Sequence, residues 1–278
     1  MLSIRTNAAS LNAQRNLAKS QRLMDSSLSR LSSGMRITKA SDDAAGLAVS
    51  ESLRAQVRGL QQASRNASDG ISVVQIAEGA MNEITNMLIR QRELAEQSAS
   101  DGISDTERAY LQTEFTALSN EIDRISASTA FAGNNLIDGT GTDMDFQVGI
   151  DDSPNSRVTV GFGTLNVTAG ALGVDAAGAT VDNKANARAA LTAVDGAINN
   201  VSRNRADLGS IANRLVSTVN NLGVSVENIA AANSRIRDVD VASESARMTR
   251  AQILMQAGVS VLAQANSTPQ YALSLLKG

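Results

Sequence analysis

Hydrophobic residues recur at steps of three and four along two segments that lie far apart in the chain, one from Leu53 to Leu88 and one from Leu191 to Ile236. The first segment has apolar residues at Leu53, Val57, Leu60, Ala67, Ile71, Val74, Met81 and Leu88. The second has them at Leu191, Val194, Ile198, Val201, Leu208, Leu215, Val219, Leu222, Val226, Ile229 and Ile236. A sustained repeat of about 3.5 residues is typical of helices that pack along a seam. The pattern therefore predicts a chain that folds back on itself, with two long helices side by side.

Shorter apolar stripes precede and follow these segments. They consist of Leu17, Met24, Leu28, Leu31 and Met35 near the amino terminus, and of Met248, Met255 and Leu262 near the carboxyl terminus. The spacing predicts an amphipathic helix that ends near Gly34 and another that begins after Ile236. Because isolated short helices are marginal in water, we interpret both stripes as a seam that is completed only when copies of the chain polymerise.

Capping residues locate the ends of the helices between these stripes. Ser41, Asp42 and Asp43 supply a capping hydroxyl and two carboxylates, so we expect the first long helix to run from about Asp42 to about Ser98. Ser104 and Glu107 form a capping-box pattern that opens the next helix. The short connection between these two helices favours antiparallel packing.

Residues 133–185 have a different pattern, rich in Gly, Thr, Asn and Asp, in which apolar residues alternate. The stretch from Asp151 to Ser156 is typical of a hairpin turn. We expect a small β-hairpin region here, followed by a return helix capped by Asp182 or Asn183. The predicted fold class is mainly α: an elongated antiparallel helical bundle or coiled-coil rod, with a small β region in the middle.

Some residues do not fit the seams. The polar ones at apolar positions are Ser64, Glu78, Arg205 and Asn233, and the glycines inside the first long helix are Gly46, Gly59, Gly70 and Gly79. We expect the polar residues where the seam opens to solvent or to a third helix, with specification of the register as the weaker alternative. The glycines are interpreted as points of close helix contact.

Composition excludes several function classes. The 278 residues include no cysteine and no histidine, so a zinc site and a Ser-His-Asp triad are excluded, and no catalytic, metal or cofactor site emerges. A net charge of -3 does not favour nucleic acid as a partner. The sequence also shows no secretory signal and no membrane-spanning run. We therefore expect a protein that is not an enzyme and that acts through assembly.

Long ordered motifs lie near both termini of the chain. They are the stretch from Ser10 to Ile84, which contains RLSSG and ASDDAAGLA, then SRNRADLGSIANRL (Ser202 to Leu215), the stretch from Glu227 to Asn266, and the ending PQYALSLLKG. Together these motifs resemble the bacterial flagellin family. The resemblance implies a structural subunit that polymerises into the extracellular flagellar filament for motility. It implies export in an unfolded state through the flagellar type III apparatus. Its expected partners are further copies of the chain, an export chaperone, the filament cap and hook-associated proteins.

The resemblance also implies a division of the chain. Residues 1–44 and 237–278 would form an inner-tube domain that is disordered in the monomer and a coiled coil in the filament. Residues 45–236 would form the outer-tube domain, with 133–185 as its small β region. Larger members of the family insert variable outer domains after the hairpin, whereas this chain passes almost directly from Gly170–Asp175 into the return helix.

Some residues of this chain match positions at which family members bind proteins other than flagellin. By resemblance, Arg90, Leu94 and Glu114 stand where family members contact the vertebrate Toll-like flagellin receptor, although Ile89 replaces the usual glutamine. Similarly, Leu273, Leu275 and Leu276 resemble leucines that are bound by the export chaperone and by cytosolic immune sensors.

Two alternatives to a filament subunit remain open at this point. A hook–filament junction protein shares the terminal helical pattern, although RLSSG, ASDDAAGLA and the LSLL ending are closer to flagellin. A secreted ligand or adhesin for host contact would be expected to carry a larger variable exterior domain. An enzyme is disfavoured because no nucleophile–base pair or set of metal ligands is visible.

Overall fold

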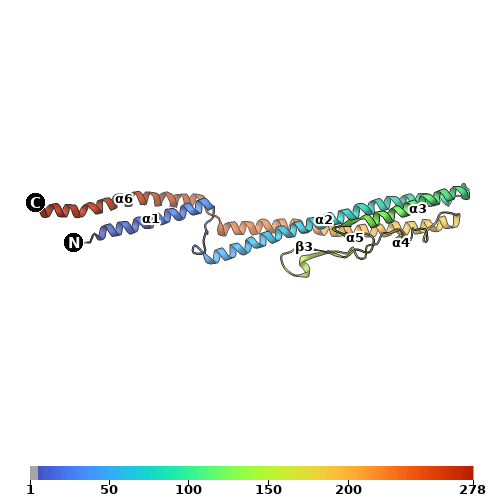
Figure 1. The fold of residues 1–278 in the computed structure, drawn as a ribbon, viewed down its shortest axis with the longest axis horizontal. Coiled ribbons are helices and arrows are strands. Elements are labelled where there is room, and N and C mark those ends of the chain that lie inside the picture. The colour runs from blue at the N-terminus through green and yellow to red at the C-terminus, as the bar shows by residue number, and fades with distance from the viewer. Residues whose placement is uncertain (1–5, 278) are drawn as a thin grey trace. The chain divides into compact units, whose positions relative to one another are not determined.

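The computed structural model describes the backbone of residues 6–277 and the side chains of residues 6–267. Its elements are α1 (Ala8–Ser33), α2 (Ala44–Ser98), α3 (Asp105–Ser128), β1 (Ala130–Phe131), β2 (Asn134–Asn135), β3 (Met144–Gln147), the 3-10 helix η1 (Pro154–Ser156), β4 (Arg157–Val160), α4 (Ala169–Leu172), α5 (Lys184–Arg237) and α6 (Val241–Lys277) (Figure 1). Contacts group the chain into two compact units. Unit 1 is Met1–Val57 with Glu227–Gly278, and unit 2 is Arg58–Val226.

The helix boundaries predicted from the sequence are confirmed. α1 ends at Ser33 because Gly34 adopts the left-handed conformation, with φ of 70°. α2 begins at Ala44 and ends at Ser98. Of the two candidates for the cap of α5, Asn183 has this role, since its Oδ1 accepts a hydrogen bond from the Asn186 amide at 2.9 Å.

In unit 2, α2, α3 and α5 pack around one common core, and α2 runs in the direction opposite to the other two helices. Its buried stripe includes Val74, Met81 and Leu88, which share one core with Val194, Val201 and Leu208 of α5 and with Phe115 and Ile122 of α3. Two of the polar residues predicted to lie in the seams face each other, as Arg205 and Glu78 form a half-exposed ion pair at 3.8 Å. These charges lie at the solvent-facing rim of the seam, which agrees with the prediction that polar residues occur where the seam opens to solvent.

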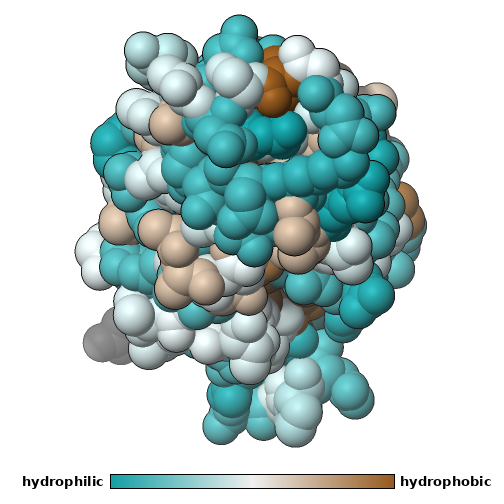
Figure 2. All heavy atoms as spheres, turned by 90° about the vertical axis from the view of Figure 1, so that its right-hand side faces the viewer, coloured by the Kyte–Doolittle hydropathy of each residue, from teal (hydrophilic) through white to brown (hydrophobic). Residues whose placement is uncertain are grey.

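The turn between α2 and α3 is stabilised by side chains as the capping pattern predicts. The Ser104 amide donates to Glu107 at 2.7 Å, and Ser104 Oγ accepts from the Glu107 amide. Arg108, only 5% exposed, donates to the backbone oxygens of Ser100 and Ile103. A buried guanidinium thus satisfies two backbone carbonyl groups of the turn between α2 and α3. The surface at this end of unit 2 is largely hydrophilic (Figure 2).

The predicted hairpin is formed by β3 and β4, which pair antiparallel with Phe146 opposite Val158. It lies on α2, where two of the helix glycines leave room for it. A Cβ at Gly59 would lie 2.8 Å from Ile150, and one at Gly70 would lie 3.1 Å from the Phe146 ring. The prediction that these glycines mark close contacts between helices therefore holds only at Gly70, where an added Cβ would also lie 3.2 Å from Leu215 of α5. At Gly59 the neighbour is the hairpin, and at Gly79 no atom lies within 4 Å.

Buried hydroxyl groups tie irregular segments of the chain to the helices, both between β4 and α5 and between β2 and β3. Ser98 of α2 donates to the Val181 oxygen at 2.5 Å, and Ser119 of α3 donates to the Val174 oxygen at 2.7 Å. Ser126 donates to the Ile137 oxygen at 3.0 Å. These serines fall outside the hydrophobic stripes, and their role was not predicted from the sequence.

In unit 1, α1 and α6 lie side by side in opposite directions, so the beginning of α1 is close to the later part of α6 (Figure 1). Asn7 donates to the Ala265 oxygen at 2.8 Å, whereas at the other end Ser27 donates to Glu244 at 2.6 Å. The predicted pairing of the two chain ends is therefore confirmed.

Candidate assembly surfaces on the terminal helices

The seam between α1 and α6 is narrow and made largely of small residues. Its buried side chains are Ser10, Ala13 and Ser27 on α1, and Glu244, Ala251 and Ala265 on α6. Leu17 packs on Gly258, where an added Cβ would lie 3.4 Å from its Cδ1. Small residues let two helices approach closely, but they bury little apolar area.

The larger residues predicted to form the seam are only partly covered in the single chain. Leu17, Met24, Leu31, Met35, Met248, Met255 and Leu262 are half-buried. Leu28, placed in the same stripe from its spacing, is 57% exposed and lies outside the seam. The stripe is thus wider than one helix partner can cover.

A polar cluster lies within this seam. Glu244, only 4% exposed, accepts the hydrogen bond from Ser27 and lies 3.9 Å from Arg30 and 3.6 Å from Arg247. Arg30 also lies 3.7 Å from Asp42. Periodicity alone does not predict this cluster, because Glu244 and Ser27 are polar residues that occupy buried positions.

Large apolar side chains are exposed around both terminal helices. They are Leu11, Leu23 and Leu28 on α1, and Val241, Ile253, Leu254, Val259 and Val261 on α6. On α6 these residues are spread around much of the helix, as expected for a helix that several neighbours surround. Exposed apolar surface of this extent is a feature of interaction sites.

The breaks that separate the terminal helices from the long helices are joined to each other. The Arg36 amide donates to the Arg237 oxygen at 2.6 Å, and the Val239 amide donates to the Gly34 oxygen at 3.0 Å. Asp42 accepts hydrogen bonds from the hydroxyl and amide of Thr38, and these bonds hold the pKa of the Asp42 carboxyl below its usual value. The two breaks therefore form one fixed joint.

The residues that resemble receptor contacts are only partly brought together on the surface. The Arg90 guanidinium donates to Glu93 and Glu114, both at 2.9 Å, and these bonds raise its pKa. Leu94, however, is 0% exposed and belongs to the core of unit 2, whereas Ile89 is 46% exposed. Of the three predicted receptor contacts, Arg90 and Glu114 therefore have accessible side chains, whereas Leu94 does not.

The predicted chaperone and sensor residues, Leu273, Leu275 and Leu276, lie outside the residues whose side chains are described. Their role stays a prediction.

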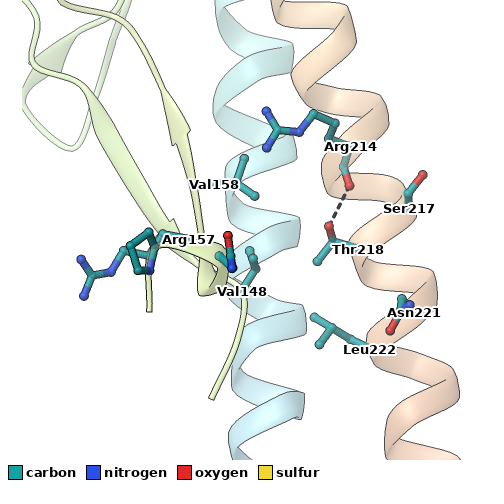
Figure 3. A pocket seen from close by; sticks show the side chains of 10 residues that line it. Val148, Arg157, Val158, Arg214, Ser217, Thr218, Asn221 and Leu222 are labelled. Atoms are coloured by element: carbon teal, nitrogen blue, oxygen red, sulfur yellow. Dashed lines mark hydrogen bonds between the residues drawn. The ribbon is translucent and has the colours of Figure 1, made fainter. Parts of the chain in front are cut away.

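A groove of about 530 Å³ lies in unit 2 between the β3–β4 hairpin and α5. Figure 3 shows Val148 and Val158 of the hairpin facing Thr218 and Leu222 of α5, whereas Arg157 points away from the helices. The lining has no carboxylate, and Arg157 is already paired with Asp152.

The described residues contain neither a metal-binding cluster nor a membrane-spanning helix. No group of three or more His, Cys, Asp or Glu side chains there could hold a metal ion. Nor does that part of the chain contain a helix that is both long and apolar enough to cross a membrane.

Comparison with known proteins gives matches at both ends and over the full length. The model of the bacterial flagellin N-terminal helical region matches residues 4–142, and that of the C-terminal helical region matches residues 191–276. The chain is 43% identical over 274 residues to a flagellin of Halalkalibacterium halodurans, covering 99% of both chains. It is 42% identical over 288 residues to the flagellar filament 33 kDa core protein of Treponema phagedenis, again covering 99% of both. The crystal structure of Bacillus cereus flagellin is similar with a TM-score of 0.50 and 31% identity, covering 61% of this chain and 94% of that one.

Proposed function

This chain belongs to the bacterial flagellin family, and from that premise we propose that its terminal helices drive the assembly of the filament. The protein is a structural subunit of the extracellular flagellar filament, which serves motility. In this proposal residues 1–44 and 237–278 form the inner, polymerising domain, and residues 45–236 form the outer one. The division is drawn at the start of α2 and at the end of α5, whereas the compact units divide inside these two helices.

The observation that carries the proposal is the contrast between the two sets of helices. The α2–α3–α5 core buries residues such as Met81, Leu88 and Phe115 almost completely within one chain. The α1–α6 pair instead leaves Leu28, Ile253 and Val261 each more than half exposed. Burial of these exposed side chains would still lower the free energy of the terminal helices. Neighbouring copies of the same chain can cover them.

Removal of residues 237–278 tests the proposal. The shortened chain should keep the helical circular dichroism of the α2–α3–α5 core and sediment as a monomer, while the full chain forms filaments in electron micrographs. Filaments of normal appearance from the shortened chain would contradict the proposed role of the terminal helices.

We infer the export route and the remaining partners of this chain from its membership of the family. We propose that the amino-terminal residues 1–44 direct type III export, that the carboxyl-terminal leucines bind a chaperone, and that the cap and hook-associated proteins meet the assembled subunit. Fusion of residues 1–44 to a reporter should give secretion that depends on an intact flagellar export apparatus. Secretion of the reporter without that apparatus would contradict this role.

Recognition by the Toll-like receptor is proposed in a narrower form. Arg90 and Glu114 are accessible for it, whereas Leu94 is buried. Substitution of both charged residues by alanine should weaken receptor signalling by monomer, and an unchanged response would contradict their role.

A hook–filament junction protein and an enzyme remain as alternatives to test. Full-length similarity to filament proteins favours an abundant subunit, so the chain should be the main component of isolated filaments. We also propose that it has no catalytic activity, in keeping with a family of structural proteins and a sequence without cysteine or histidine. Real turnover by purified monomer in a hydrolase screen would contradict that.

A further inference from the structure

Four half-buried methionines lie in the described parts of the terminal region, residues 6–44 and 237–267, and Met35 differs from the other three in its position. The other three lie inside α1 and α6 and are Met24, Met248 and Met255. Met35 instead lies in the break after α1, where it pairs with Asp238 in an antiparallel bridge. A chemical change at this thioether therefore acts directly on the joint between the two breaks.

The sulfur of Met35 accepts a hydrogen bond from a residue that holds the joint together. Arg237 Nε donates to Met35 Sδ at 3.1 Å, and Arg237 Nη1 is paired with Glu51 at 2.5 Å. The carbonyl oxygen of Arg237 accepts the bond from the Arg36 amide at 2.6 Å. Only 17% of the Arg237 side chain is exposed. The guanidinium group is therefore fixed by its other partners and has little freedom to move away from the sulfur.

A thioether that solvent can reach is open to oxidation by a peroxide. A lone pair of the sulfur attacks one oxygen of hydrogen peroxide, the O–O bond breaks, an S–O bond forms, and the second oxygen leaves as water. The sulfur gives up the two electrons that reduce the peroxide. The product is a polar sulfoxide, which a methionine sulfoxide reductase converts back to the thioether. Met35 is partly accessible to such an oxidant, whereas Met81 in the core of unit 2 is 0% exposed.

We propose that Met35 is an oxidation site at which a peroxide loosens the joint and thereby hinders assembly. The inference rests on the proposed role of the terminal helices, because they are attached to the long helices through this joint. A thioether sulfur is only a weak acceptor, so Arg237 Nε donates to the sulfoxide oxygen instead, from one bond length further away. That displacement opposes both the ion pair with Glu51 and the backbone bond to Arg36.

Oxidation of a defined variant tests the site. A Met24→Leu/Met248→Leu/Met255→Leu chain retains Met35 and loses the other three methionines of the described terminal region. After its monomer is treated with hydrogen peroxide, the critical concentration for polymerisation should rise about threefold to tenfold, the effect of one lost hydrogen bond. Methionine sulfoxide reductase should restore the untreated value. The matched control carries Met35→Leu in addition and should assemble equally well before and after peroxide.

A second test needs no oxidant and leaves the seam between α1 and α6 unchanged. Met35→Gln places a carbon atom at the position of the sulfur and an amide oxygen beyond it, as the sulfoxide does. It should therefore raise the critical concentration by a similar factor. Met35→Leu conserves the volume of the side chain without adding a polar group, so it should stay within about twofold of the wild type. This comparison holds even if the three leucine substitutions of the first test disturb the terminal helices.

The outcomes separate this oxidation site from the proposed function. Peptide mass mapping measures the sulfoxide at each methionine. If Met35 resists a peroxide treatment that oxidises Met24 in the wild type, or if Met35 is oxidised without any change in the critical concentration, the proposal is wrong. It is equally wrong if Met35→Gln and Met35→Leu assemble alike. In each of these cases the role of the terminal helices stands. If the chain shortened at residue 237 still forms filaments, the role of the terminal helices itself is wrong.

Discussion

Gly70 and Gly79 occupy the same helix, yet a methyl group added to each would meet different surroundings. At Gly79 no atom lies within 4 Å of the new Cβ, so Gly79→Ala should stabilise the protein by about 0.5–1 kcal/mol through helix propensity. At Gly70 the Cβ would lie 3.1 Å from Phe146 and 3.2 Å from Leu215, so Gly70→Val should destabilise it by about 1–3 kcal/mol through overpacking. Urea unfolding of both variants measures the difference, and equal effects would contradict the assigned packing.

Asp42 gives a residue-scale prediction about pH. Hydrogen bonds from Thr38 lower its pKa in the folded chain, so its stabilising contribution is fully present above the pKa of the unfolded chain, about 3.9. The contribution is lost as the pH falls through the lower folded value. Asp42→Asn should therefore speed amide exchange of residues 36–43 at neutral pH, and its effect on stability should vanish in strong acid. A destabilisation that grew on acidification would contradict this assignment.

Among the helices, α1 and α6 are the elements expected to open first. Their seam buries small residues such as Ala13, Ala251 and Ala265, whereas α2 buries Val74, Met81 and Leu88 completely. Local opening requires little free energy where few apolar contacts are lost. In the monomer, amides of α1 and α6 should exchange within seconds to minutes while the α2 core stays protected for far longer. In filaments both sets should be protected, and slow exchange of α1 in the monomer would contradict the predicted disorder of the termini.

The same elements show what the sequence can predict. The ends of the helices are set by capping residues that lie next to them in the sequence, such as Gly34, Ser104 and Asn183. They could therefore be located without a structure. The serines that tie the irregular chain to α2 and α3 could not, because hydroxyl bonds to distant backbone leave no periodic signal. Spacing also failed at Leu28, where a narrow seam leaves one edge of the stripe uncovered, and resemblance could not reveal that Leu94 is buried.

At the scale of the whole molecule, charge is unevenly divided along the chain. Residues 1–44 and 237–278 together have eleven Lys and Arg against six Asp and Glu, although the net charge of the whole is -3. The middle of every copy is therefore strongly acidic, and its exposed carboxylates include Asp69, Glu83 and Asp207. Neighbouring copies in a filament must bring these acidic regions close together, which opposes assembly at low ionic strength.

Salt should therefore lower the critical concentration for polymerisation. Between about 10 and 150 mM salt the Debye length falls from about 30 Å to about 8 Å, which screens repulsion between the acidic regions more than it weakens partly buried ion pairs. Sedimentation across this range should show assembly improving with salt. An Asp69→Asn/Glu83→Gln/Asp207→Asn variant should already assemble better at low salt and respond less to added salt. A critical concentration that rises with salt would instead mean that ion pairs between copies outweigh the repulsion of their middle regions.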